Sequence, residues 1–168
     1  MKIRHSSYND IPSIISIIEQ AQIAFKIAGI DQWQNHYPNI PTIENDIKLN
    51  ESYVIEMDDK IVGTFVLSFR IEDTYNIIYD GEWLTHDAYA VIHRIAFDSS
   101  IKGKGYSKSI IELIEKMVIN NNVYSIKIDT HEDNQIMRKM LSSTGFTHCG
   151  TILLRDGNKR LAFEKTLK

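Results

Sequence analysis

The chain has 168 residues and a formal net charge of −3, a length typical of one domain and a charge balance that argues against a general nucleic-acid binder. The single cysteine, Cys149, excludes an internal disulfide and any CxxC-type zinc or redox site. No apolar run approaches the roughly 18 residues of a membrane span, and the N-terminus does not resemble a signal peptide. We therefore expect one globular domain over residues 1–168, in the cytoplasm, that binds neither nucleic acid nor membrane.

The N-terminal region predicts a short strand followed by a long helix. After a strand over residues 2–5, Ser7 and Asp10 have the spacing of an N-cap with its reciprocal acid. Isoleucines then recur at helical intervals, and the helix is expected to end near Gly29.

The next region predicts a loop, a short helix and a hairpin. Aromatic residues and prolines over residues 31–41 indicate a loop, and a short helix is expected over 42–49. Strands over residues 52–57 and 61–69 flank Asp58-Asp59-Lys60, which is typical of a hairpin. Residues 71–87 are expected to be irregular.

The second half of the chain predicts four strands and two helices. Residues 88–97 are apolar on both faces, as in a buried central strand. Apolar residues over 110–118 and 136–141 mark helices, the second ending at Gly145, and Asp156-Gly157 indicates a hairpin turn. The four strands are expected over residues 88–97, 124–129, 146–154 and 160–166.

The resulting element order is β-α-α-β-β-β-α-β-α-β-β. It predicts an α/β (α+β) fold with a mixed, largely antiparallel sheet of about seven strands and four helices. One βαβ unit is expected over residues 88–129.

The strongest chemical signal is the segment Lys102-Gly103-Lys104-Gly105-Tyr106-Ser107-Lys108, between a buried strand and a helix. Glycines let the backbone turn sharply beside a ligand, and the first helical N–H groups are unpaired, which favours a phosphate. A Walker A loop is excluded by Tyr106, and the dinucleotide fingerprint by Lys108. The alternative is a flexible, solvated turn.

These residues resemble the GNAT superfamily of N-acetyltransferases, whose R/Q-x-x-G-x-G/A loop binds the pyrophosphate of coenzyme A. Here Lys102 replaces the usual Arg or Gln, and Ser107 replaces Gly or Ala. The resemblance continues through Asn134-Gln135-Ile136-Met137 and Ser142-Ser143-Thr144-Gly145-Phe146, and the predicted element order is also that of the family.

The resemblance implies acetyl-CoA as cosubstrate. It assigns the pyrophosphate to the loop amides from Lys102 to Lys108, and a contact with pantetheine to Asn134. The alternative for Asn134 is a helix-start residue that satisfies the backbone. Pantetheine is expected to pair with the main chain of Ile95, Ala96 and Phe97, where an N–H near Ile95 would polarise the thioester carbonyl.

The resemblance also implies catalytic residues. His93 corresponds to a strand histidine that serves as general base in a member of the family, and its alternative is a hydrogen-bonded core histidine. Asp129 and His131 are further candidates, which would otherwise cap the following helix. Leu141 occupies the position where the family often has a tyrosine acid, so the proton for the thiolate needs another group or water.

The resemblance implies that the acceptor substrate binds at the aromatic loops of this chain. Trp33, Tyr37, Tyr79 and Trp83 are expected to frame a small amine. Arg94 is a candidate for gripping a substrate carboxylate, which would suit an amino acid. The alternative is that these aromatics cover the sheet edge or form a dimer contact.

The leading hypothesis is an acetyl-CoA-dependent N-acetyltransferase acting on a small-molecule amine by direct transfer in a ternary complex. The alternatives are a protein or peptide N-acetyltransferase, a CoA-binding regulatory domain without catalysis, and a nucleotide-binding module. The six histidines show no HxxxH or HxH spacing, so no metal is expected. Homodimers are common in this superfamily, and no feature of the sequence fixes an interface.

Overall fold

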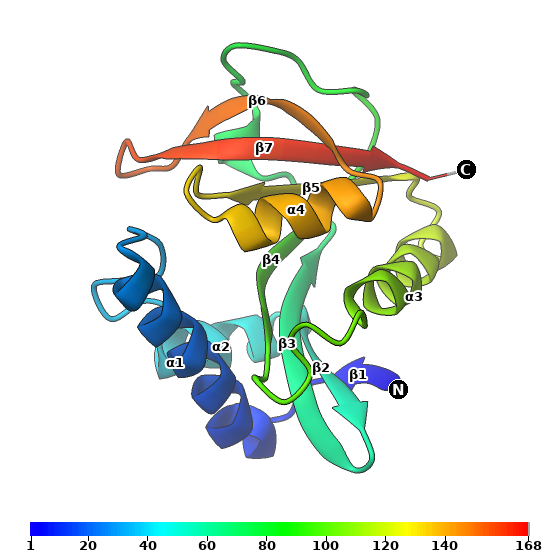
Figure 1. The fold of residues 1–168 in the computed structure, drawn as a ribbon. Coiled ribbons are helices and arrows are strands. Elements are labelled where there is room, and N and C mark those ends of the chain that lie inside the picture. Colours follow the sequence, from blue (N-terminus) through cyan, green and yellow to red (C-terminus); the bar gives the residue numbers. More distant parts are fainter. Residues whose placement is uncertain (168) are drawn as a thin grey trace. The chain divides into compact units, whose positions relative to one another are not determined.

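A computed structural model describes residues 1–167 (Figure 1). The elements are β1 (Lys2–His5), η1 (Tyr8–Asp10), α1 (Ile11–Ala28), α2 (Ile40–Lys48), β2 (Ser52–Met57), β3 (Lys60–Ser68), η2 (Asp73–Tyr75), β4 (Ala90–Phe97), α3 (Ser107–Asn120), β5 (Ser125–Thr130), α4 (Gln135–Ser143), β6 (Thr147–Leu153) and β7 (Lys159–Thr166). This order is the one that the sequence predicts.

The seven strands form one sheet in the order β1-β2-β3-β4-β5-β7-β6. The pairs β1–β2, β2–β3, β5–β7 and β6–β7 are antiparallel, whereas β4 and β5 are parallel. The predicted fold class is confirmed, and α3 connects the parallel pair as the expected βαβ unit.

Internal contacts divide the chain into two units. Unit 1 comprises Met1–Leu67 and His93–Tyr106, and unit 2 comprises residues 68–92 and 107–167. The border crosses β4 between Ile92 and His93. The single-domain organisation over residues 1–168 stays a prediction.

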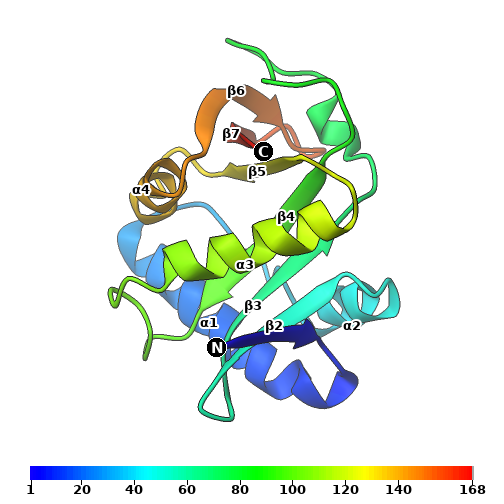
Figure 2. The same cartoon turned by 90° about the vertical axis from the view of Figure 1, so that its right-hand side faces the viewer.

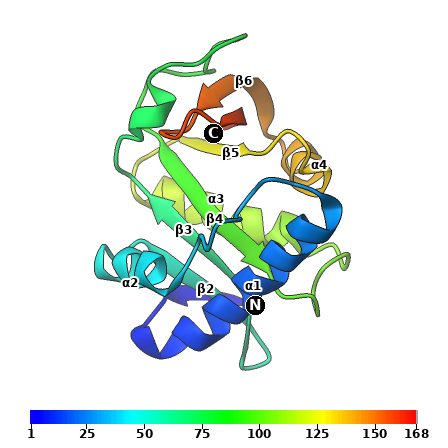
Figure 3. The same ribbon diagram turned by 90° about the vertical axis from the view of Figure 1, so that its left-hand side faces the viewer.

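Unit 1 contains α1 and α2, which contact one another, and α2 also contacts β2 (Figure 3). The expected cap precedes α1, where the Asp10 carboxylate accepts hydrogen bonds from the Ser7 N–H (2.7 Å) and hydroxyl (3.0 Å). Gly29 ends α1 at φ +70°, a left-handed conformation that glycine adopts without steric cost. The β2–β3 turn consists of Asp58 and Asp59, both left-handed, as a two-residue hairpin requires.

The segment Tyr8–Ala28 is long and apolar enough to cross a membrane by length and composition alone, and an 18-residue window within it has a mean hydropathy of 1.2. This differs from the expectation from the sequence, which found no apolar run long enough for a membrane span. A buried core helix passes the same test. Ile14 and Ile18 of α1 are fully buried and pack with Ile43 of α2 and Val54 of β2, so one face of the helix belongs to the core of unit 1.

In unit 2, β7 lies between β5 and β6, and α4 runs beside these strands (Figure 1). The helix α3 contacts β5, and its buried face carries Ile110, Ile111 and Ile114 (Figure 2). A second cluster forms on Tyr75, Trp83 and other buried residues. Its remaining buried members are Val91, Cys149, Ile152 and Ala162.

Candidate functional site

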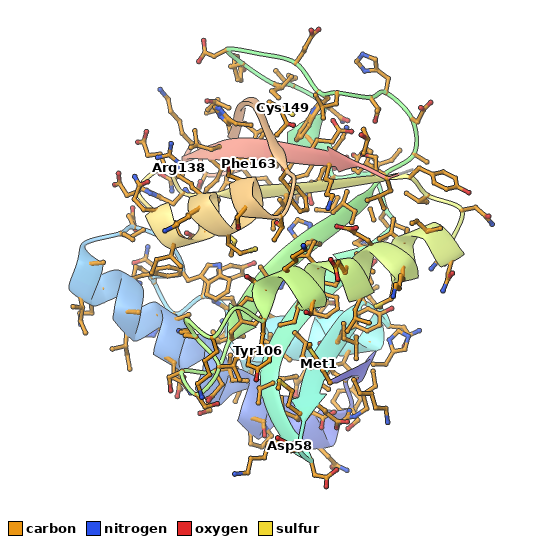
Figure 4. All side chains as sticks on the ribbon, turned by 45° about the vertical axis from the view of Figure 1, so that its right-hand side comes forward. Met1, Asp58, Tyr106, Arg138, Cys149 and Phe163 are labelled. Atoms are coloured by element: carbon orange, nitrogen blue, oxygen red, sulfur yellow. The ribbon has the colours of Figure 1, made fainter. Side chains whose placement is uncertain are left out.

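The loop between β4 and α3 has free space around its glycines and backbone N–H groups without acceptors among the described residues. Gly103 and Gly105 have φ values of +74° and +79°, and a Cβ at either would meet nothing within 4 Å. The Lys104 N–H donates to the Ile101 carbonyl (3.3 Å), whereas within residues 1–167 the N–H groups of Gly103 and Gly105 have no acceptor. These groups are therefore available to a ligand (Figure 4 labels Tyr106, the last residue of this loop).

The loop is also positively charged. Lys102, Lys104 and Lys108 are exposed, and Ile101 is buried and fixes the start of the turn. Open N–H donors with three lysines at a strand-to-helix turn form the donor set that a pyrophosphate needs.

The strand β4 is irregular at Arg94, which has a φ of +50°. A non-glycine residue in this conformation interrupts the regular side-chain alternation, as in a β-bulge. The ladder between β4 and β5 consists of the pairs Ala90–Ile126 and Val91–Lys127, so it ends before His93. The segment Ile95–Phe97, which is expected to pair with pantetheine, lies beyond this ladder.

In unit 1, Arg94 is held by α2 and by the loop before it. Its Nε and Nη2 donate to the two carboxylate oxygens of Asp46 (2.8 and 2.6 Å), and its Nη1 donates to the Tyr37 hydroxyl (2.9 Å). Burial raises the pKa of Asp46, and the charges of Arg94 and His93 lower it in part. Burial lowers the pKa of Arg94, but Tyr37 and Asp46 outweigh it, so the pKa is raised overall. Arg94 is thus engaged within the protein, and its role toward a substrate stays a prediction.

In unit 2, Asp129 accepts a hydrogen bond from the Tyr75 hydroxyl at 2.7 Å. Burial and the neighbouring Asp129 charge raise the pKa of Tyr75 well above its usual value, so the phenol stays protonated and donates. The carboxylate of Asp129 is consequently fixed at the end of β5.

His131 follows β5 and folds back on its own chain. Its Nδ1 accepts from the Asp133 N–H at 3.1 Å, so in the neutral ring the proton lies on Nε2. To act as base, His131 would first have to give up this hydrogen bond.

Asn134 is the N-cap of α4. Its Oδ1 accepts from the Met137 N–H (3.1 Å), which confirms the backbone-satisfying alternative. A contact with pantetheine stays a prediction.

The predicted aromatic residues fall into different environments. Trp33 packs edge-on against Phe25 and lines a cavity of about 390 Å³ in unit 1. Tyr37 is exposed and bound to Arg94, and Tyr79 is exposed and lines a cavity in unit 2. Only 8% of Trp83 is exposed, and its Nε1 donates to the Tyr75 carbonyl (2.9 Å), so it is mainly a packing residue.

Sequence reasoning missed a buried polar network under residues 72–89 of unit 2. Glu164 is fully buried and accepts from the Leu84 N–H (2.7 Å) and from the hydroxyls of Thr85 and Ser125 (both 2.6 Å). The Lys127 ammonium lies 4.3 Å from the ring centre of Trp83 and 4.2 Å from that of Tyr89, and burial lowers its pKa. Alternating polar residues at 125, 127 and 129 were the available signal.

Residues 1–167 contain no group of three His, Cys, Asp or Glu side chains that would hold a metal ion. Leu141 is fully buried and its side chain has no proton to give, and burial raises the pKa of the Cys149 thiol.

The mixed sheet with a parallel β4–β5 pair, together with the open glycine loop before α3, has the architecture of the GNAT fold. Over residues 17–146 the chain matches the family model of the Acetyltransferase (GNAT) family. The chain belongs to this family, and it is an N-acetyltransferase.

Solved structures agree with this assignment. A GNAT-family acetyltransferase from Streptococcus agalactiae 2603 is 30% identical, with a TM-score of 0.90 over 99% of this chain and 95% of that one. A GNAT-family acetyltransferase from Listeria monocytogenes 4b F2365 is 23% identical, with a TM-score of 0.74 over 99% and 94%.

A third similar fold is AAC(6')-Ib in complex with paromomycin and acetyl-CoA, at 15% identity and a TM-score of 0.72 over 98% and 92% of the two chains. Among the curated proteins, no significant match to this chain is found.

Proposed function

We propose that the protein transfers the acetyl group of acetyl-CoA to the amine of a small molecule, directly and within a ternary complex. The observation that carries this proposal is the loop at residues 102–108. It combines exposed lysines with two left-handed glycines whose N–H groups have no acceptor in the part of the chain that the structure describes.

The residues present fit the cosubstrate. The N–H groups of Gly103 and Gly105 would hold the pyrophosphate, and Lys102, Lys104 and Lys108 would balance its charge. The main chain of Ile95 to Phe97, beyond the short β4–β5 ladder, would pair with the pantetheine amides. When bound, acetyl-CoA supplies an activated acyl carbon.

Acetyl transfer requires a deprotonated acceptor amine. The amine nitrogen forms a bond to the acyl carbon, the carbon–sulfur bond breaks, and the thiolate leaves with its electron pair. One proton leaves the amine and one proton finally reaches the sulfur.

We assign the base to His93, because its imidazole lies on β4 within electrostatic reach of the Asp46 carboxylate. Asp129, fixed by Tyr75, is the alternative base. The proton for the thiolate comes from water or another group, because the Leu141 side chain has none to give.

A small acceptor is supported by the cavities. Unit 1 contains a cavity of about 390 Å³ lined by Trp33, and unit 2 contains one of about 430 Å³ lined by Tyr79. Both are within the size range of small-molecule sites.

The proposal is tested by thermal melting of the protein with acetyl-CoA and, separately, with ATP and NAD. Acetyl-CoA at 100 times its dissociation constant stabilises the folded state by about 2.7 kcal/mol. For a chain of this size the midpoint then rises by roughly 5–10 °C. Thiol release with a panel of small amines must follow, and a shift with acetyl-CoA but no turnover on any amine would favour a regulatory CoA-binding domain. No shift with acetyl-CoA would refute the proposed site.

A further inference from the structure

Arg94 of β4, in unit 1, has a backbone conformation that its residue type disfavours. Its φ is +50°, and among residues 1–167 it is the only non-glycine residue with a positive φ inside a strand. The other residues of this kind lie in turns and loops, and most of them are asparagine or aspartate, which tolerate the conformation better than other side chains do. An arginine keeps it where the surrounding structure holds it there.

The side chain of Arg94 is anchored at all three of its nitrogen atoms. Nε and Nη2 donate to the two carboxylate oxygens of Asp46 at 2.8 and 2.6 Å, and Nη1 donates to the Tyr37 hydroxyl at 2.9 Å. The ion pair is largely buried, since the side chain of Arg94 is 17% exposed and that of Asp46 is 3% exposed. A bidentate pair fixes the plane of the guanidinium as well as its position.

Both anchors of Arg94 are themselves fixed within unit 1. Asp46 lies on α2, and Ile43, one turn earlier, is buried in the cluster that this helix forms with α1 and β2. Tyr37 precedes α2, and its backbone carbonyl accepts a hydrogen bond from the Gln22 side chain of α1 at 2.9 Å. The guanidinium is therefore held by two elements that have their own contacts with the rest of unit 1.

The conformation of Arg94 sets the direction of the next peptide group. The peptide plane between Arg94 and Ile95 is rigid, so its orientation follows from the backbone torsions at residue 94. The N–H in this plane belongs to Ile95, and it is the group expected to polarise the thioester carbonyl. The left-handed turn at residue 94 and the direction of the N–H at residue 95 are therefore one structural requirement.

We propose that Arg94 is a positioning residue for acetyl transfer, which holds β4 in a left-handed turn through Asp46 and Tyr37 and so directs the Ile95 N–H at the thioester carbonyl. Arg94 then takes no part in proton transfer and binds no substrate carboxylate, because its guanidinium is committed to the protein. The inference rests on the proposed placement of acetyl-CoA in unit 1, and it specifies how one side chain contributes to that site.

Substitution of Arg94 by glycine and by alanine separates a positioning role from a substrate contact. Both variants remove the guanidinium and leave Asp46 without its partner, so they differ only in one methyl group. Glycine adopts a positive φ without steric cost, whereas a Cβ disfavours it. With acetyl-CoA and the amine of highest turnover in the panel, kcat of Arg94→Gly should exceed that of Arg94→Ala by roughly 5- to 30-fold, with the KM of the amine unchanged.

A spectroscopic measurement reports on the thioester itself. Acetyl-CoA labelled with ¹³C at the thioester carbonyl is bound to each protein, and the stretching frequency of this carbonyl is read from infrared difference spectra. A hydrogen bond from the Ile95 N–H lowers the frequency. The wild-type protein and Arg94→Gly should share the lower frequency, and Arg94→Ala should show a higher one. Calorimetric titration should give similar acetyl-CoA affinities, because the loop at residues 102–108 is unchanged.

Two controls address the lost ion pair. Arg4→Ala breaks another bidentate pair of unit 1, in which Arg4 donates to both carboxylate oxygens of Asp10 at 2.7 and 2.9 Å. Arg4 has no positive φ, so this variant should lose thermal stability while kcat and the carbonyl frequency keep their wild-type values. Asp46→Asn, added to the glycine and alanine variants, removes the unpartnered carboxylate, so the comparison stands even where the single variants fold poorly.

The outcomes separate this inference from the proposed function. If Arg94→Gly and Arg94→Ala have equal kcat values or equal carbonyl frequencies, the inference is overturned although acetyl transfer stands. A raised KM for the amine in both variants, with kcat retained, would also overturn it and assign Arg94 to the substrate. If the wild-type protein does not bind acetyl-CoA, the proposed function fails, and the inference fails with it.

Discussion

Substitution of Gly105 by valine tests the cofactor loop, because this residue combines a left-handed backbone with open space around it. At a φ of +79° a residue with a Cβ is disfavoured by about 1–2 kcal/mol, and a β-branched side chain adds to this. No neighbouring atom lies within 4 Å of the added Cβ, so packing costs nothing further. The midpoint of thermal unfolding should therefore fall by only roughly 2–8 °C.

Gly105→Val should also weaken the binding of acetyl-CoA. The loop relieves its strain by turning residue 105 to a negative φ, which redirects the N–H groups beside the pyrophosphate. Each hydrogen bond to a charged group contributes about 1.5–3 kcal/mol, so losing one weakens binding by roughly 10- to 150-fold. Calorimetric titration with acetyl-CoA measures the change directly.

Gly157→Val is the matched control. Gly157 has a φ of +83° and equally open surroundings, but it belongs to the β6–β7 turn. It should show similar destabilisation with unchanged acetyl-CoA affinity. Full affinity in Gly105→Val would refute the placement of the pyrophosphate, and an equal loss in both variants would attribute the effect to stability alone.

Three other outcomes are expected. Glu164→Ala leaves buried donors, among them the Ser125 hydroxyl, without an acceptor. The free energy of unfolding, measured in urea, should therefore fall by about 3–5 kcal/mol. A decrease below about 1 kcal/mol would contradict the role of this carboxylate. The hydrogen bond from Arg4 lowers the pKa of Asp10 to about 2. The pair therefore stabilises the folded protein fully above about pH 4, near the pKa of the unfolded chain. On the order of 1–2 kcal/mol of the free energy of unfolding is lost as the pH falls from about 4 through 2. Urea unfolding across this range should show the loss in the wild type and its absence in Arg4→Met. Finally, His93→Ala should lower turnover by roughly 100-fold, whereas Tyr75→Phe, which removes the hydrogen bond from the Tyr75 hydroxyl to Asp129, should leave the pH–rate profile in place; the reverse pattern would make Asp129 the base.

The elements that were predicted correctly depend on neighbours in the chain. The pairing of Ser7 with Asp10, the helix end at Gly29 and the turn at Gly157 each involve residues a few positions apart. The open glycines at 103 and 105 are also a local property, since a left-handed φ needs only the absence of a Cβ. The spacing of residues along the sequence is therefore enough to predict these caps, turns and open glycines.

The features that sequence analysis missed join residues far apart. Tyr75 reaches Asp129 across 54 positions, Thr85 reaches Glu164 across 79, and Arg94 reaches Asp46 across 48. No local pattern marks such pairs, because a buried polar residue has the same appearance in a sequence whichever partner it finds. The conformation of Arg94 was also missed, since a left-handed residue within a strand is rare outside glycine.

The sequence by itself determined the order of the elements, the mixed sheet and the open glycine loop before α3, because periodicity, caps and glycines act over short distances. Only the tertiary structure decided which charged groups form ion pairs inside the protein and which do not. Arg94 and Arg160 are both arginines on strands, yet Asp46 binds the first, whereas the second donates to the Lys159 carbonyl oxygen and has no ion pair among residues 1–167. That difference arises from burial and from partners brought together by folding, and both are properties of the assembled sheet.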